Sequence, residues 1–238
     1  MEPTLTVAAA QPPVVGADLP QTVRAHAEVV RAARSRLVVF PELSLTGYEL
    51  DAPAVAVEDP VLQPLLDACR ETRTVALVGA PVGPPGATSI AVVRVDQAGA
   101  RVAYRKTWLD GREAARFVPG DGPAVTEVDG WRVGLGVCKD TGAAQHTVGT
   151  AALGVDVYAA GVVHHPEELA EQEARAVVIA RTCDAYVVLA GFAGATGGGY
   201  ARTAGSSGVW SPTGAALARA GTEPGGVATC TLTRIPPA

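Results

Sequence analysis

The sequence predicts an α/β fold, and three observations support this prediction. Short apolar runs rich in β-branched residues recur along the 238 residues. Amphipathic segments of helical period separate some of these runs, while others are joined by hairpin signals, which favours mixed sheets that carry helices on their outer faces. Hydrophobic residues make up 48% of the chain and charged residues 18%, enough for a substantial core. With no linker or repeat in the sequence, we interpret residues 1–238 as a single domain.

The individual elements follow from short apolar runs, which predict strands, and from amphipathic spacing, which predicts helices. The predicted strands are residues 5–10, 37–40, 75–80, 89–95, 101–104, 125–128, 132–138, 155–160, 185–190, 207–210, 215–220 and 227–232. Amphipathic spacing predicts helices over 19–35 and 61–73, and shorter signals predict helices over 147–154 and 167–182. The last of these has acidic residues in its first turn, which suits the helix dipole. Turn residues at 96–99, 129–130 and 212–214 predict hairpins.

Composition also excludes several classes of function. The formal net charge of −5 argues against nucleic acid or an anionic membrane as the main partner. No apolar run is long enough for a transmembrane helix, and the segment Met1–Thr4 lacks the basic start of a signal peptide. The four cysteines are widely spaced, so we expect neither a structural zinc site nor a disulfide framework. These features predict a cytoplasmic protein with reduced thiols.

Lysine is rare in this chain, which contains two lysines and seventeen arginines. Lys106 lies in the segment Tyr-Arg-Lys-Thr-Trp-Leu, and Lys139 directly follows Cys138. A surface position usually accepts Arg in place of Lys, so a retained lysine indicates a need for a compact, tunable ammonium. Lys106 is therefore a candidate site residue, with chance survival in an arginine-rich chain as the alternative.

Two further candidates stand at the ends of predicted strands. Cys138 lies beside a lysine and ahead of a predicted helix, surroundings that lower the pKa of a thiol. Glu42 follows the strand predicted at 37–40 and is flanked by leucines, so partial burial would raise its pKa and suit a general base. The alternatives are a buried structural cysteine and an ordinary loop carboxylate. Glu113, seven residues after Lys106, would by itself be a surface glutamate.

Together these segments resemble the nitrilase superfamily of carbon–nitrogen hydrolases, whose signature is a Glu-Lys-Cys triad with each member at a strand end. The matching segments are Phe-Pro-Glu-Leu at 40–43, Tyr-Arg-Lys-Thr-Trp-Leu at 104–109 and Gly-Leu-Gly-Val-Cys-Lys-Asp at 134–140. Lys106 follows Glu42 by 64 residues, and Cys138 follows Lys106 by 32. Supporting matches are Ala-Ala-Ala-Gln at 8–11, Thr-Gly-Tyr at 46–48, Glu113 with Phe117 and Gly120, and Gly-Ser-Ser-Gly at 205–208 followed by Pro-Thr-Gly.

The resemblance implies a four-layer α-β-β-α sandwich and an amidase-like hydrolase without a cofactor. It implies that Glu42 is the general base, that Cys138 is the nucleophile, and that Lys106 and the backbone N–H of Lys139 stabilise the oxyanion. Glu113 matches the family's second glutamate. The implied reaction releases ammonia or an amine from a small linear amide through a thioester. The resemblance also implies a homodimer or larger homo-oligomer.

The segment after the nucleophile departs from the pattern of amidase-like members. They usually carry Tyr-Asp-Leu-Arg-Phe-Pro-Glu, whereas residues 139–145 read Lys-Asp-Thr-Gly-Ala-Ala-Gln. The departure leaves the triad intact and the substrate class open. Lys139 could add positive charge near the pocket and favour a substrate that carries a carboxylate, or it could point into solvent.

Three other residues are candidates for substrate contact. Tyr48 lies in the segment after Glu42, and the pair His164 and His165 follows the strand predicted at 155–160. The alternative for the histidines is a helix-capping or surface pair. No spaced cluster of Cys, His and Asp accompanies them, so we predict no metal site. Gly197–Gly199 lacks the pattern of a phosphate-binding loop, and the segment 205–208 lacks that of a serine nucleophile elbow.

Two other functions stay open beside the amidase. A nitrilase or carbamoyl-amide hydrolase would use the same triad with a different pocket lining. A non-catalytic binding protein could have kept the fold, and the altered segment after Cys138 motivates that alternative.

Overall fold

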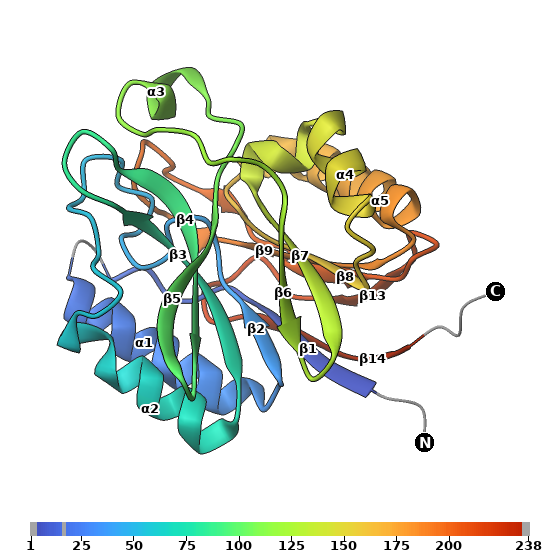
Figure 1. Ribbon diagram of the computed structural model, residues 1–238, viewed down its shortest axis with the longest axis horizontal. Helices are drawn as coiled ribbons and strands as arrows, with labels where there is room; N and C mark the ends of the chain where they lie inside the picture. Colours follow the sequence, from blue (N-terminus) through green and yellow to red (C-terminus); the bar gives the residue numbers. More distant parts are fainter. Residues whose placement is uncertain (1–3, 16–17, 235–238) are drawn as a thin grey trace.

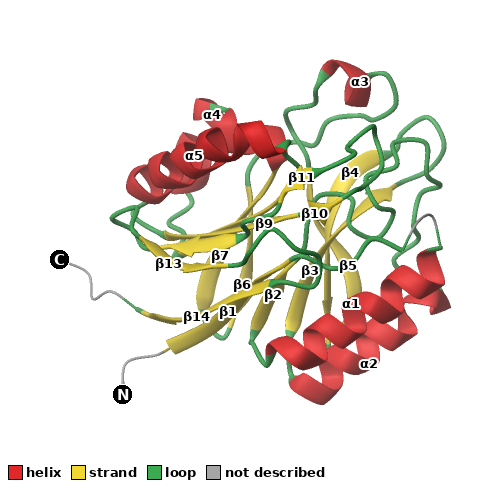
Figure 2. Ribbon diagram, turned by 180° about the vertical axis from the view of Figure 1, so that it is seen from behind, coloured by secondary structure: helices red, strands yellow, loops and turns green. Residues whose placement is uncertain are grey.

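The computed structural model of the protein describes residues 4–15 and 18–234. Two six-stranded mixed sheets pack face to face, and a pair of helices covers the outer face of each sheet. Figure 1 and Figure 2 show these layers from opposite sides. The predicted four-layer α-β-β-α sandwich is thereby confirmed.

The first sheet has the strand order β14-β1-β2-β3-β4-β5. Its strands are β1 (Thr4–Ala10), β2 (Leu37–Val39), β3 (Val75–Val82), β4 (Ser89–Asp96), β5 (Gly99–Arg105) and β14 (Val227–Thr233). The strands β1, β2 and β3 are parallel to one another, and the outer pairs are antiparallel. The helices α1 (Leu19–Ala33) and α2 (Gln63–Thr72), the second preceded by the 3₁₀ turn η1 (Pro60–Leu62), connect the parallel strands and cover this sheet.

The second sheet has the order β13-β12-β9-β8-β7-β6. Its strands are β6 (Ala124–Val128), β7 (Trp131–Val137), β8 (Val157–Val162), β9 (Tyr186–Gly191), β12 (Gly208–Trp210) and β13 (Ala216–Arg219). Here β7, β8 and β9 are the parallel strands. The helices α4 (Ala144–Ala151) and α5 (Leu169–Cys183) lie on its outer face (Figure 2).

The strand sequences divide their side chains between the layers with a period of two residues. In β1, Leu5 and Val7 face the core between the sheets, whereas Ala8 faces α1 and α2. In β8, Val157 faces the core between the sheets and Tyr158 faces α5. The central core is therefore built from one face of each sheet.

Several element boundaries differ from the prediction for local reasons. The helix predicted at 19–35 ends at Ala33, because Arg34 takes a left-handed conformation with φ 48°. The helix predicted at 147–154 begins earlier, at Ala144. The strand predicted at 132–138 ends at Val137, and Cys138 begins the 3₁₀ helix η2 (Cys138–Gly142).

The structure also contains short elements that periodicity did not predict. These are the four-residue helix α3 (Gly111–Ala114) and the strands β10 (Ala193–Gly194) and β11 (Thr203–Ala204), whereas the 3₁₀ turn η3 (Pro166–Glu168) forms the start of the helix predicted at 167–182. They are too short for a periodic signal. Within the described part of the chain, no helix combines the length and apolar character needed to cross a membrane. Residues 1–3, used in the signal-peptide prediction, lie outside the described residues.

Candidate active site

Three segments that leave the two sheets converge at one end of the sandwich. Glu42 follows β2 of the first sheet, Lys106 directly follows β5 of the same sheet, and Cys138 directly follows β7 of the second sheet. The Nζ atom of Lys106 lies 2.7 Å from Glu42 Oε1. The charges of Glu42 and Lys106 both act on the Cys138 thiol, which places all three groups in one cluster.

The loop that carries Glu42 passes between a glycine of each sheet. A Cβ atom on Gly79 of β3 would lie 2.2 Å from the backbone N of Leu43, and one on Gly161 of β8 would lie 2.7 Å from the backbone N of Glu42. Neither glycine therefore has room for a side chain. Leu43 adopts φ 50°, an uncommon conformation for a leucine. This packing fixes the backbone of Glu42 between the two sheets.

The Lys106 side chain is almost completely buried, with 1% of its surface exposed. The Lys106 backbone is held by two hydrogen bonds, from its N–H to Ile90 O and from Gly120 N–H to its own carbonyl. The ammonium donates to Glu42 Oε1 at 2.7 Å and to Glu113 Oε1 at 2.6 Å. A single cation thus lies between two buried carboxylates.

Glu113 is held by the short helix α3. Its Oε2 accepts from the backbone N–H of Asp110 at 2.9 Å, while the Asp110 side chain accepts from the N–H of Glu113 at 2.8 Å. This reciprocal pair is a capping box. Tyr48 donates its hydroxyl to Glu113 Oε1 at 3.2 Å. The second glutamate of the sequence prediction is therefore buried beside Lys106 rather than on the surface.

Cys138 occupies a strained position at the end of β7. Its φ of 40° lies in the left-handed region, which costs free energy for a residue with a side chain. The thiol donates to the carbonyl of Val163 at 3.4 Å, and the residue is half-buried. Strain of this kind is common at functional sites, where the surrounding structure fixes a side chain in an otherwise unfavoured direction.

Burial and like charges set the protonation states of the cluster. Burial raises the pKa of Glu42 to about 8, and the nearby Glu113 adds to this rise while Lys106 opposes it. Burial alone would lower the pKa of Lys106, but the carboxylates of Glu42 and Glu113 raise it above its ordinary value. The lysine is therefore a permanent cation.

The expectation of a lowered pKa for Cys138 was wrong. Burial raises the pKa of the thiol, and the carboxylate of Glu42 raises it further, while Lys106 lowers it by less. The sequence showed the neighbouring lysine but not the two carboxylates that the fold brings to the same cluster. A thiol in these surroundings is protonated at neutral pH and needs a base to become a nucleophile.

The four residues predicted to contact substrate lie in different surroundings. Tyr48 is buried next to Glu113, and its ring meets that of Tyr200 edge to face at 5.4 Å. Lys139 is exposed, and its ammonium donates to the carbonyl of Leu109 at 2.8 Å. This contact agrees with the interpretation of Lys139 as a surface lysine.

The side chains of the two histidines point to different neighbours. The His164 ring is buried and lies within hydrogen-bonding distance of Gln172 on α5, 3.0 Å away, so it faces that helix. His165 is exposed and stacks on the ring of Tyr200 at 4.3 Å. Its backbone N–H donates to Glu168 at the start of η3. Of the pair, only His165 approaches the aromatic group beside the cluster.

Two residues near the cluster were missed in the sequence. Tyr200 follows the glycines 197–199, and the charges of Cys138 and Glu42 contribute, after burial, to raising its pKa to about 12. Its signal was a lone tyrosine in a glycine-rich segment. Asp140 belongs to the matched segment 134–140, yet its burial and its three hydrogen bonds were not foreseen. In residues 4–15 and 18–234, no three metal-ligating side chains gather into a candidate metal site.

The comparison with protein families agrees with this geometry. The model of the family described as "Carbon-nitrogen hydrolase" matches residues 6–235. The chain belongs to this family. The resemblance to the nitrilase superfamily that the sequence showed is thereby confirmed.

Two curated relatives match part of this chain. An (R)-stereoselective amidase from Pseudomonas sp. is 33% identical over 130 residues, covering 53% of this chain and 47% of that protein. A protein of Pseudomonas protegens described as "Hydrolase in pqqF 5'region" is 32% identical over 126 residues, covering 49% of this chain and 44% of that protein. The chain spans about half the length of the curated relatives it matches.

Solved structures share the fold over nearly the whole chain. The amidase from Nesterenkonia sp. AN1 in complex with butyramide has a TM-score of 0.84 at 23% identity, covering 96% of this chain and 91% of that one. Another structure of that amidase, with acrylamide added to its active-site cysteine, has a TM-score of 0.83 at 23% identity and covers 98% and 93%. Nit3 from Saccharomyces cerevisiae, a nitrilase-superfamily member, has a TM-score of 0.85 at 19% identity and covers 97% and 90%.

Proposed function

We propose that this protein hydrolyses the C–N bond of a small linear amide with Glu42, Lys106 and Cys138 as its catalytic triad. The observation that supports this most directly is the buried Lys106 ammonium, which two carboxylates hold within the cluster that includes the thiol. The second oxygen of Glu42, Oε2, is buried and has no hydrogen-bond partner among the described residues. A free carboxylate oxygen in the cluster is suited to accept a proton.

In the first half of the reaction, Glu42 removes the proton of Cys138 and the thiolate attacks the amide carbon. The carbonyl oxygen becomes an oxyanion that Lys106 and the backbone N–H of Lys139 stabilise. Lys139 lies in the first turn of η2, where N–H groups have no partner within the helix. Collapse of this intermediate breaks the C–N bond, and Glu42 returns its proton to the departing amine.

In the second half, water attacks the thioester and releases the acid. Glu42 accepts a proton from this water, and the same oxyanion contacts stabilise the second tetrahedral intermediate. Glu113 orients the ammonium through its 2.6 Å contact with Lys106 Nζ. The thiol proton is restored when the carbon–sulfur bond breaks.

The relatives support an amide as the substrate. The Nesterenkonia amidase has been solved with butyramide and with acrylamide joined to its cysteine. The Pseudomonas relative is named as a stereoselective amidase. A nitrile or carbamoyl-amide substrate would use the same triad, and the departure at residues 139–145 motivates a non-catalytic binding protein as the contrasting alternative.

Ammonia release from short-chain amides, ω-amides, carbamoyl-amines and nitriles tests these alternatives. We expect turnover of at least one short amide and none by Cys138→Ala. Cys183→Ala is the matched control, because Cys183 is also half-buried but contacts Thr147 instead of the cluster. If the wild-type protein releases no ammonia and Cys138 alkylates no faster than Cys183 at neutral pH, the protein is a binding protein rather than an enzyme.

The homo-oligomer implied by the resemblance stays a prediction. Val148 of α4 and Val178 of α5 are each 59% exposed and would supply apolar area to an interface between copies. The molar mass measured by light scattering after size exclusion tests it. The single-domain and cytoplasmic assignments likewise stay predictions.

A further inference from the structure

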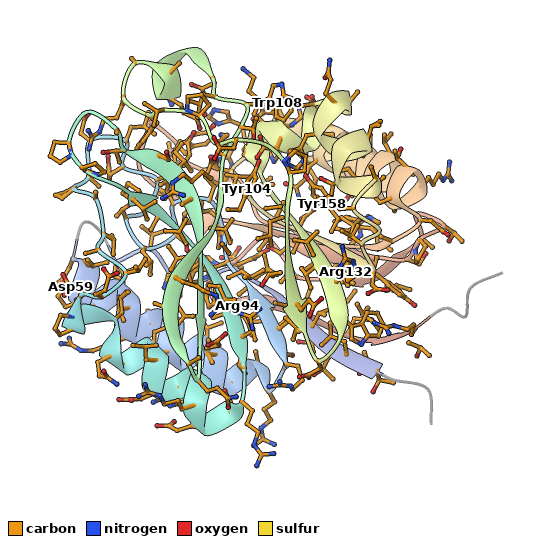
Figure 3. All side chains as sticks on the ribbon, viewed as in Figure 1. Asp59, Arg94, Tyr104, Trp108, Arg132 and Tyr158 are labelled. Atoms are coloured by element: carbon orange, nitrogen blue, oxygen red, sulfur yellow. The ribbon has the colours of Figure 1, made fainter. Side chains whose placement is uncertain are left out.

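A buried polar network adjoins the triad and takes no part in the proposed bond cleavage. Its members are Tyr104 of β5, Asp140 of η2, His146 of α4 and Tyr158 of β8, and none is more than 3% exposed. In Figure 3 the labelled Tyr104 and Tyr158 lie with Trp108 in the upper part of the molecule, away from Arg94. The network therefore joins β5 to the consecutive elements η2, α4 and β8.

Asp140 is the centre of this network. Its Oδ1 accepts from the backbone N–H of Trp108 at 2.9 Å. Its Oδ2 accepts from the hydroxyl of Tyr104 at 2.8 Å and from the backbone N–H of Val137 at 2.9 Å. Tyr104 and Trp108 lie two residues before and after Lys106, and Val137 directly precedes Cys138. One carboxylate thus connects both sides of the lysine to the nucleophile segment.

The remaining members hold this carboxylate in place. The Tyr104 oxygen lies 3.1 Å from His146 Nε2, and Tyr158 Oη lies 3.2 Å from His146 Nδ1. Because Tyr104 donates to Asp140, its oxygen accepts from Nε2–H of the imidazole, and Nδ1 accepts from Tyr158. A neutral imidazole fits this pattern, and burial lowers the pKa of His146. Gly136 leaves room for the Tyr158 hydroxyl, because a Cβ there would lie 2.2 Å from it.

We propose that Asp140 is a positioning residue that fixes the Lys106 ammonium relative to the Cys138 thiol, and that Tyr104 and His146 keep its carboxylate in that role. The proposal rests on the proposed function, in which one oxyanion contacts both Lys106 and the N–H that follows Cys138. These two donors come from different sheets, and the hydrogen bonds of Asp140 join the segments that carry them. Small displacements of such groups reduce the rate strongly.

An asparagine cannot replace this carboxylate. Each Asp140 oxygen accepts from a backbone N–H, and a backbone N–H cannot reverse its direction. In either orientation, an asparagine amide would direct its NH₂ group at the N–H of Trp108 or at that of Val137. Asp140→Asn therefore loses either the Trp108 hydrogen bond on the lysine side or the Val137 hydrogen bond on the cysteine side, with almost no change in side-chain size.

The test compares Asp140→Asn with the wild-type protein on an amide that the wild type hydrolyses. We expect kcat to fall about 100-fold with KM changed less than about threefold, because the Cys138 thiol and the oxyanion donors are no longer correctly placed relative to each other. The rate at which acrylamide alkylates Cys138, followed by mass spectrometry, should fall about tenfold in parallel. This second readout needs no turnover.

Asp96→Asn is the matched control. Asp96 is also buried and accepts from the backbone N–H of Ala98 and from Arg94, at a site away from the triad. Its variant should lose comparable stability and retain kcat within about twofold. A loss of kcat in both variants would show a general structural effect and overturn the proposal.

Tyr104→Phe provides the second variant in case Asp140→Asn does not fold. It removes one hydroxyl and leaves both backbone hydrogen bonds of Asp140, so we expect a reduction in kcat of about 3- to 10-fold. An unchanged kcat and an unchanged alkylation rate in Tyr104→Phe, or in a folded Asp140→Asn variant, would overturn the positioning role. The proposed hydrolase function would still stand in that case, provided that Cys138→Ala is inactive. If the wild type hydrolyses no amide, the proposed hydrolase function is wrong. The alkylation rates of Cys138 in the wild type and the variants then test the positioning role by themselves.

Discussion

Lys106 illustrates at the scale of one residue why an arginine-rich chain retains a lysine. Its ammonium contacts Glu42 Oε1 at 2.7 Å and Glu113 Oε1 at 2.6 Å, and the side chain is 1% exposed. A space bounded by two carboxylates and packed backbone fits a compact cation, and a guanidinium is broader and planar. The scarcity of lysine in the sequence therefore has a steric and electrostatic explanation at this position.

Replacing this lysine by arginine tests the explanation. Lys106→Arg keeps the charge, so the protein should still fold, with a loss of about 1–3 kcal/mol from overpacking. We expect kcat to fall by about 100-fold or more, because the charge no longer lies where the oxyanion forms. Circular dichroism and amide turnover measure the two effects. Full activity in this variant would contradict the oxyanion role of Lys106.

The pH dependence of the reaction belongs to the same scale. In the proposed reaction Glu42 must be ionised to accept the thiol proton, and burial raises its pKa to about 8. As pH falls below that value, Glu42 becomes protonated, so kcat/KM should decrease, and as pH rises through it, kcat/KM should increase. The raised pKa of Cys138 means that thiol ionisation does not produce this limb. A rate that is constant between about pH 6 and pH 9 would contradict Glu42 as the base.

At the scale of elements, the loop after β2 depends on close contact with both sheets. Gly161 of β8 approaches this loop so closely that a Cβ would lie 2.6 Å from Phe40 O and 2.7 Å from Glu42 N. The neighbours are backbone atoms, which cannot move aside as a flexible side chain could. The position of Glu42, the proposed general base, is therefore constrained by a glycine on the opposite sheet.

Gly161→Ala should displace this loop. We expect a loss of about 1–3 kcal/mol in the free energy of unfolding and a fall in kcat of about tenfold or more, because Glu42 moves relative to Cys138. Gly221→Ala is the matched control, since a Cβ there meets no atom within 4 Å and the residue has no positive φ. Urea denaturation and turnover give both quantities. Equal behaviour of the two variants would show that the close contact has no consequence.

At the scale of the whole molecule, polar contacts made by side chains hold the two sheets together in addition to the apolar core. Arg94 of the first sheet donates to Thr126 Oγ1 and Glu127 O of the second sheet, both at 2.6 Å. It also pairs with Asp96 at 2.6 Å, and its side chain is 11% exposed. Arg36 and Asp129 form a second pair between the sheets. Figure 3 shows Arg94 in the lower half of the molecule, away from Tyr104 and Trp108.

Arg94→Met should weaken the contact between the sheets without changing the chemistry. We expect a loss of about 2–4 kcal/mol, because the largely buried Asp96 loses its main partner and Glu127 O loses a charged donor. Arg31→Met, which removes an exposed pair with Glu71 on the helix layer, should cost less than about 1 kcal/mol. Chemical denaturation measures both. A kcat change in folded Arg94→Met would contradict the separation of this contact from the active site.

The repeating patterns of the sequence account for most of the fold and for the identities of the candidate triad residues. The apolar runs at 5–10 and 155–160 indicate strands that are buried on both faces, and the amphipathic stripe of 19–35 indicates a helix with one buried face, local properties that survive into the structure. The departures come at ends and short turns, such as Cys138, where tertiary contacts rather than periodicity decide the conformation.

The sequence by itself determined that Glu42, Lys106 and Cys138 each stand at or just after the end of a strand, because short apolar runs locate the strands themselves. Only the tertiary structure decided their protonation, which of His164 and His165 lies near the site, and the connection through Asp140. The physical reason is that pKa values and hydrogen-bond partners depend on distances through space between residues far apart in the chain. The thiol pKa is raised because the fold buries the cysteine and brings two carboxylates close to it, although its neighbour in the sequence is a lysine.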